Sequence, residues 1–116
     1  MNIKIKRVYE KPAKDDGSRI LVDRLWPRGL TKEKASVDLW LKDVAPTTEL
    51  RKWFGHDPEK WDRFRGRYET EIRHNDDLIE ILKGKANQGT ITLIYAARDE
   101  KHNEALVLKR YLEKIS

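Results

Sequence analysis

The 116-residue chain carries 25 Lys and Arg residues against 20 Asp and Glu residues, a formal net charge of +5. Its length is that of one domain, and we expect a single domain over residues 1–116. The absence of cysteine excludes disulfides, thiolate metal sites and a cysteine nucleophile, whereas the net positive charge favours anionic partners.

The first two predicted elements are strands. Ile3 and Ile5 alternate with lysines, a period-2 pattern that predicts a strand near the N-terminus. The continuous apolar run 20–22 predicts a central strand, buried on both faces of a sheet that helices cover. We expect the turn cluster 15–18 to precede this strand and the Pro-Arg-Gly sequence at 27–29 to end it.

Short helices and a third strand are predicted next. Thr31 is placed to cap a helical turn that ends at residue 35. Residues 37–41 alternate between apolar and polar side chains and predict a strand, an amphipathic helix being the alternative interpretation. The sequence Pro-Thr-Thr at 46–48 opens a short helix that ends at Gly55.

Two longer helices follow. Asp57 and the proline after it are a typical helix start, because the carboxylate accepts from free N–H groups and proline is tolerated in the first turn. The apolar face of this helix consists of Trp61, Phe64, Tyr68 and Ile72. Asn75 or Asp76 starts the next helix, which carries Leu78, Ile81 and Leu82.

The last part of the chain predicts a strand and a helix. Residues 90–95 are rich in β-branched side chains and predict the clearest strand, which residues 96–97 continue. Asp99 is placed to cap the last helix. The buried side of that helix is expected to consist of Ala105, Leu106, Leu108, Leu112 and Ile115.

The order of these elements predicts the fold class. Strands and helices are mixed along the chain, so we expect a small α/β domain with a mostly parallel sheet of about four strands, flanked by helices. No window of the chain is apolar over the length of a membrane span, and no secretory signal is recognised. A cytoplasmic protein with no membrane partner is therefore expected.

Polar residues gather where two predicted strands end, at 23–29 and at 95–103. Ligands of parallel α/β sheets bind beyond the carboxyl ends of strands. Guanidinium groups bind carboxylates and phosphates with two hydrogen bonds, which predicts an anion site if the two strands are neighbours. The candidate ligand-binding residues are Arg24, Trp26, Arg28, Tyr95, Arg98, Asp99 and Asn103. In the structural alternative, Asp23 pairs with Arg24 or Arg98 and Asp99 is only a helix cap.

The candidate catalytic residues are His56, Asp57, His102 and Asp23. An imidazole titrates near neutral pH, so His56 or His102 is suited to move a proton, with Asp57 or Asp23 to orient the ring. The alternative for His56 is a loop histidine bonded to backbone. His56, Asp99 and His102 lack the spacing of a metal motif, so no metal is predicted. The chain has neither a Walker loop nor a GxGxxG motif, and no cofactor is predicted.

Three blocks of the chain resemble the YeaO-like proteins, the family of domain of unknown function 488. The first block is 21–30 (LVDRLWPRGL), and the second is 40–46 (WLKDVAP) continued by 49–57 (ELRKWFGHD). The third is 92–99 (TLIYAARD), followed by His and Asn at 102–103. The blocks cover nearly the whole chain in the expected order. The resemblance implies a compact α/β domain, and it brings no assigned activity.

Three functions are compatible with these patterns. The first is an enzyme or a small-molecule binder that acts on an anionic, phosphate-bearing ligand held by arginines. The second is a nucleic-acid-binding module that uses the net positive charge and Trp26. The third is a protein-interaction domain without catalysis, which would expose a large apolar patch.

Overall fold

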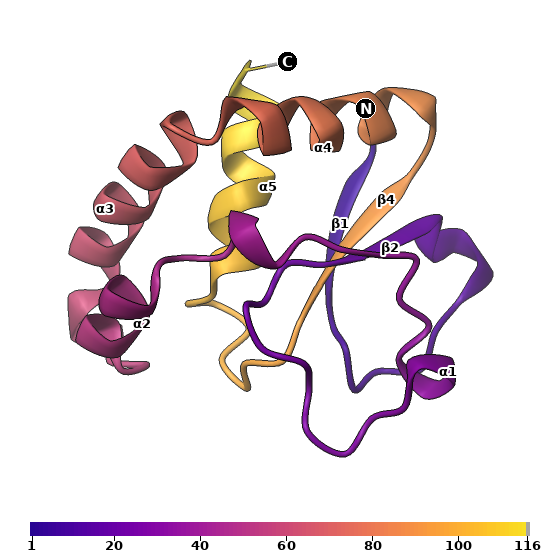
Figure 1. Ribbon diagram of the computed structural model, residues 1–116, viewed down its shortest axis with the longest axis horizontal. Coiled ribbons are helices and arrows are strands. Elements are labelled where there is room, and N and C mark those ends of the chain that lie inside the picture. Colours follow the sequence, from indigo (N-terminus) through magenta and orange to yellow (C-terminus); the bar gives the residue numbers. More distant parts are fainter. Residues whose placement is uncertain (116) are drawn as a thin grey trace.

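Four parallel strands form the sheet in the computed structural model, which describes residues 1–115 (Figure 1). Their order across the sheet is β1-β4-β2-β3, so the clearest predicted strand, β4, lies between the first two. The strands are β1 (Ile3–Arg7), β2 (Ser18–Leu21), β3 (Leu39–Trp40) and β4 (Ile91–Tyr95). The predicted α/β class and mostly parallel sheet are confirmed. All four strands place their carboxyl ends at the same edge of the sheet.

The longest helices pack on one side of this sheet. The helices are α1 (Lys32–Ala35), α2 (Thr48–Phe54), α3 (Trp61–Arg73), α4 (Asp76–Gln88) and α5 (Glu104–Ile115). Helix α5 packs against β1 and β4, and α3 packs against α5. None of the helices within residues 1–115 is long and apolar enough to cross a membrane.

The predicted apolar run 20–22, at the end of β2, faces two different cores. Ile20 and Val22 belong to the larger core, which α2, α3, α4 and α5 complete, whereas Leu21 belongs to a smaller core on the other face of the sheet. The smaller core is closed by Ala35 of α1 and by the loop after β2, through Trp26. All three residues of the run are fully buried, and β2, which carries the first two, lies between β4 and β3, so the prediction of a central strand is confirmed.

Predicted capping residues mark the starts and ends of the helices. The Oγ1 atoms of Thr31 and Thr47 each accept a hydrogen bond from a backbone N–H in the first turn of α1 and α2. Gly55 ends α2 with a φ of 54°, in the left-handed region that favours glycine. The carboxylate of Asp57 caps a short 3-10 helix, Pro58–Lys60, that leads into α3. Each of these expectations is confirmed.

Three strands end earlier than predicted. The expected strand at 37–41 pairs with β2 only over Leu39–Trp40, and the alternative of an amphipathic helix is wrong. Ala96 and Ala97 lie beyond the end of β4, because the chain turns there into the loop before α5. Likewise β2 ends at Leu21, well before the proline that was expected to end it.

The prediction that Asp99 caps the last helix is wrong. Helix α5 begins at Glu104, and the Oδ1 atom of Asn103 accepts the cap hydrogen bond from the N–H of Leu106. Asp99 instead accepts hydrogen bonds from two N–H groups inside the loop, those of Lys101 and His102. His102 therefore lies ahead of α5 and not one turn into it.

In two helices, α4 and α5, some of the buried apolar residues differ from the predicted ones. Ile81 of α4 is 42% exposed, and its neighbour Ile79 occupies the core instead. Ile115, at the end of α5, is 39% exposed, whereas Val107 is buried. In both helices the apolar stripe is rotated by part of a turn, because contacts with α3 and the sheet select the face that is covered.

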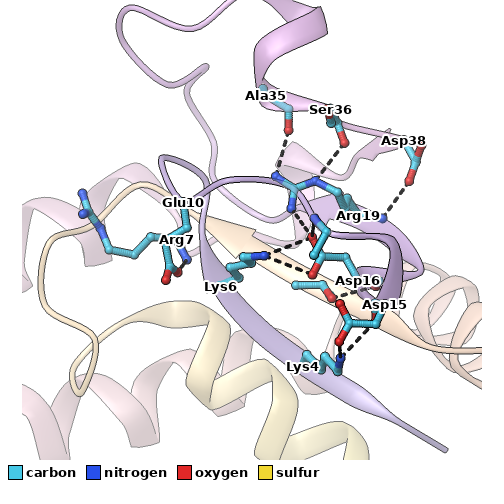
Figure 2. Close-up of polar contacts among 12 residues, drawn as sticks. Lys4, Lys6, Arg7, Glu10, Asp15, Asp16, Arg19, Ala35, Ser36 and Asp38 are labelled. Atoms are coloured by element: carbon cyan, nitrogen blue, oxygen red, sulfur yellow. Dashed lines mark hydrogen bonds and ion pairs between the residues drawn. The ribbon is translucent and has the colours of Figure 1, made fainter.

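A buried ion pair joins the turn before β2 to β2 itself, and its arginine also contacts the end of α1 (Figure 2). Arg19 Nη1 lies 2.6 Å from Asp16 Oδ2, and both side chains are about 95% buried. Arg19 also donates to the carbonyl oxygens of Ala35 and Ser36, and Lys6 Nζ donates to Asp16. Burial by itself raises the pKa of Asp16, but hydrogen bonds from a backbone N–H and from both cations lower it below its usual value. This network braces the connection between β2 and α1.

Candidate functional site

A cavity of about 660 Å³ lies beyond the carboxyl ends of the strands. Its walls come from the loop after β2, the loop after β4, and both ends of α2. In Figure 1 the loop after β4 lies beside the start of α5, at the lower end of β1 and β4. The parallel arrangement of the strands places the two polar segments predicted from the sequence around one cavity, which is where ligands of α/β sheets bind.

Most of the predicted site residues line this cavity. They are Asp23, Arg24, Trp26, Arg28, His56, Arg98, Asp99, His102 and Asn103. Two predicted residues do not: the ring of Tyr95 is buried in the larger core, and Asp57 caps the turn before α3. The structure adds Arg51 and Glu104, which sequence reasoning missed.

Three arginines of the cavity have no ion-pair partner among residues 1–115: Arg28, Arg51 and Arg98. All three residues are exposed, so their guanidinium groups are hydrated and free to bind a ligand. Arg51 comes from α2, far from both strand ends in the sequence. Nothing in its local pattern distinguishes it from a solvent-facing arginine of a helix.

Arg24 differs from the other arginines because the protein itself occupies its guanidinium group. Its Nε and Nη2 donate to the carbonyl oxygens of Pro46 and Ala45, at 3.2 and 3.1 Å. Its Nη1 lies 3.6 Å from the carboxylate of Asp43. The predicted alternative in which Asp23 pairs with Arg24 or Arg98 is therefore wrong. Arg24 fastens the loop after β2 to the segment before α2.

The carboxyl group of Asp23 lies near that of Glu104, the first residue of α5, and the two interact electrostatically. Asp23 Oδ2 also accepts from the N–H of Ala96, at 2.9 Å, which ties the ends of β2 and β4 together. Burial raises the pKa of Glu104 well above its usual value, and the charge of Asp23 raises it further. Two adjacent carboxylates cannot both ionise at low cost, so the raised pKa favours the protonated form of Glu104.

Tyr68 is buried in the larger core and donates its hydroxyl to the carbonyl oxygen of Val44, at 2.6 Å. Burial raises the pKa of Tyr68 well above its usual value, and the negative charge of Glu104 contributes. The phenol therefore stays neutral, and it holds the segment before α2 against α3. No sequence motif identified Glu104 as a site residue, because an acidic residue in the first turn of a helix is commonly explained by the helix dipole.

Asp99 and His102 form the second polar pair of the cavity. The Nδ1 atom of His102 lies 2.8 Å from Asp99 Oδ2, and its ring meets the ring of Trp61 edge to face. The hydrogen bond from His102 and the N–H of Lys101 lower the pKa of Asp99 below its usual value. Buried Asn103 donates to the carbonyl oxygen of Asp99 and fixes the turn. Of the two candidate histidines, His102 is the one whose ring a carboxylate orients.

His56 lies exposed in the turn after α2, with a φ of 57°. Its ring lies 6.3 Å from that of Phe54, and the carboxylate of Asp57 is used by the helical turn before α3.

Trp26 is also held by the protein: its Nε1 donates to the carbonyl oxygen of Leu30, and its ring packs edge to face on Trp40. Within residues 1–115 no group of three or more metal-ligating side chains is gathered.

The fold and the cavity define a small parallel α/β domain with a polar site of mixed charge beyond its strands. The profile of the family described as "Inactive DUF488-N3 subclade" matches residues 2–115, and the chain belongs to this family. The resemblance expected from the three sequence blocks is thereby confirmed.

Relatives of similar length support this assignment. The uncharacterized protein YeaO of Escherichia coli K12 is 41% identical over 115 residues, which cover 99% of this chain and all of that protein. The uncharacterized protein Rv3073c of Mycobacterium tuberculosis H37Rv is 41% identical over 110 residues, 95% of this chain and 92% of that protein. No solved structure matches the chain with significance.

Proposed function

We propose that this protein binds a small, phosphate-bearing anion in the cavity beyond its strands. One observation carries the proposal: Arg28, Arg51 and Arg98 line one cavity from three separate segments, and none is neutralised by an acidic partner among residues 1–115. Such unpaired cations repel one another, and an anion between them relieves that repulsion. Guanidinium groups suit phosphate because they donate two parallel hydrogen bonds.

A binding role is better supported than catalysis. The family is described as inactive, which favours a binding role over a reaction. A nucleic-acid interface is less well supported, because Trp26, its proposed stacking residue, is held by Leu30 and Trp40. The exposed apolar side chains are spread over several elements, such as Leu25 in the loop after β2 and Ile81 of α4.

Isothermal titration calorimetry with inorganic phosphate and pyrophosphate tests the proposal. We expect Arg98→Ala to weaken binding about tenfold or more, the loss expected for charge-assisted hydrogen bonds. Arg110→Ala is the matched control: it removes an exposed arginine of α5 that does not line the cavity, so its affinity is expected to stay within about twofold. Equal affinity of Arg98→Ala and the wild type, or the absence of binding to either anion, contradicts the proposal.

A further inference from the structure

The cavity contains two sets of side chains that cannot bind the same chemical group. Arg28, Arg51 and Arg98 attract an anion, whereas the Asp23–Glu104 pair repels one. Carboxylate oxygens accept hydrogen bonds, so the group that lies against the pair must donate. A molecule that satisfies both sets carries an anionic group and, separately, uncharged hydrogen-bond donors.

Hydroxyl groups fit the acidic pair better than an ammonium group does. Both carboxyl groups line the cavity and offer several acceptor oxygens, the raised pKa of Glu104 favours a protonated donor beside them, and a hydroxyl is itself both donor and acceptor. An ammonium group only donates, and the unpaired arginines of the same cavity oppose a further positive charge. The N–H of Ala96 already occupies one lone pair of Asp23 and fixes the orientation of its carboxylate.

The size and the apolar wall of the cavity also require more than an inorganic anion. A volume of about 660 Å³ is typical of sites for molecules with many atoms. Phe54 and Phe64, whose ring centroids lie 4.3 Å apart, form part of the wall. Their apolar surface is suited to the C–H groups of a carbon skeleton that links the anionic part to the hydroxyl groups.

We propose that the ligand is a sugar phosphate, whose phosphate lies among Arg28, Arg51 and Arg98 and whose neighbouring hydroxyls bind the Asp23–Glu104 pair. The inference rests on the proposed function, because it requires that the arginines bind phosphate. The same chemistry is present in a free sugar phosphate and in the ribose phosphate unit of a nucleotide.

The test compares the affinities of defined phosphates by calorimetry. The probes are inorganic phosphate, ribose 5-phosphate, 2-deoxyribose 5-phosphate, adenosine monophosphate and O-phosphoethanolamine. The variant is the double substitution Asp23→Asn and Glu104→Gln. It replaces each carboxyl group by an amide of similar shape and retains an acceptor for the N–H of Ala96. The matched control is Glu100→Gln, which changes an exposed acid in the loop after β4 that does not line the cavity.

In the wild type we expect ribose 5-phosphate to bind at least about tenfold more tightly than inorganic phosphate, and 2-deoxyribose 5-phosphate to bind in between. In the double variant this preference disappears, whereas inorganic phosphate binds at least as tightly as to the wild type because a repelling charge is removed. Binding of inorganic phosphate also shows that the variant folds. Glu100→Gln keeps the preference. Tighter binding of adenosine monophosphate than of ribose 5-phosphate supports the proposal and identifies a nucleotide as the source.

Three results overturn the sugar phosphate proposal and leave phosphate binding intact. They are equal affinities for inorganic phosphate and ribose 5-phosphate, a preference that persists in the double variant, and tighter binding of O-phosphoethanolamine than of ribose 5-phosphate. If no probe binds, the proposed function fails as well, so the two failures are distinguishable.

Discussion

The buried pair of Arg19 and Asp16 gives the sharpest prediction about stability. In the substitution Arg19→Met, a side chain of similar length fills the space, but Asp16 loses the guanidinium group 2.6 Å away. The carbonyl oxygens of Ala35 and Ser36 lose the donors that now lie 2.9 and 3.0 Å from them. The variant thus leaves a buried carboxylate whose one remaining cationic partner within residues 1–115 is Lys6.

Breaking a buried ion pair by removing one partner costs about 3–5 kcal/mol, because the remaining charge stays desolvated. For a domain of this size we expect the melting temperature to fall by roughly 10–20 °C. Lys4→Met is the matched control. Lys4 pairs with Asp15 at 3.2 Å, but the side chain of Asp15 is 78% exposed, and such pairs contribute less than about 1 kcal/mol.

The assay is equilibrium unfolding in urea, followed by the fluorescence of the four tryptophans. The double variant Asp16→Asn with Arg19→Met is expected to lose less free energy of unfolding than the two single losses added, because neither partner remains as a buried, unpaired charge. If Arg19→Met costs no more than Lys4→Met, burial does not strengthen this pair and the reasoning is refuted.

Three further predictions concern acid stability, a tight turn and a buried hydroxyl. The pKa of Asp16 is lower in the folded protein than in the unfolded chain, so its contribution to stability is present above the usual carboxyl range and is lost as the pH falls through it. Urea midpoints measured from pH 7 to pH 3 should fall less steeply in Asp16→Asn, and an unchanged slope would contradict this. Gly17 has a φ of 63°, and an added Cβ would lie 2.0 Å from the carbonyl oxygen of Thr90. Gly17→Ala is therefore expected to lower the free energy of unfolding in urea by at least about 2 kcal/mol. Gly29, with a φ of 78°, has open space around it, so Gly29→Ala should cost about 1 kcal/mol. Equal losses in the two variants would argue against the contact with Thr90. Tyr68→Phe leaves a buried carbonyl oxygen without its donor and should cost about 1–3 kcal/mol, with unchanged phosphate affinity by calorimetry; a loss of affinity instead would place the hydroxyl in the site.

The sequence predicted most of the polar lining of the cavity but not its charge balance. Arg28 and Arg98 were found because they follow strands, and parallel strands end at one edge of a sheet. Arg51 was missed because it lies on a helix, where an exposed arginine is ordinary. Glu104 was missed because its partner, Asp23, is 81 positions away along the chain and only the fold brings their carboxyl groups together.

Local pairings were also reassigned by the fold. The sequence allowed Asp23 to pair with an arginine of a strand end, yet Arg24 is held by the carbonyl oxygens of Pro46 and Ala45 and by Asp43. A guanidinium group donates to those acceptors that the folded backbone brings within hydrogen-bond distance in a suitable geometry. Which acceptors those are depends on the path of the loop, and residue types alone do not encode that path.

By itself the sequence determined the family, the α/β class and most element positions of this protein, because these follow from short-range patterns. Period-2 alternation near the N-terminus, the helical spacing of α3 and capping by Thr31 and Asp57 act within a few residues, and the structure confirms them. Only the tertiary structure decided the strand order β1-β4-β2-β3, the meeting of Asp23 with Glu104, and which arginines stay unpaired. Those features depend on contacts between residues far apart in the chain, whose free energies are set by packing and burial rather than by local pattern.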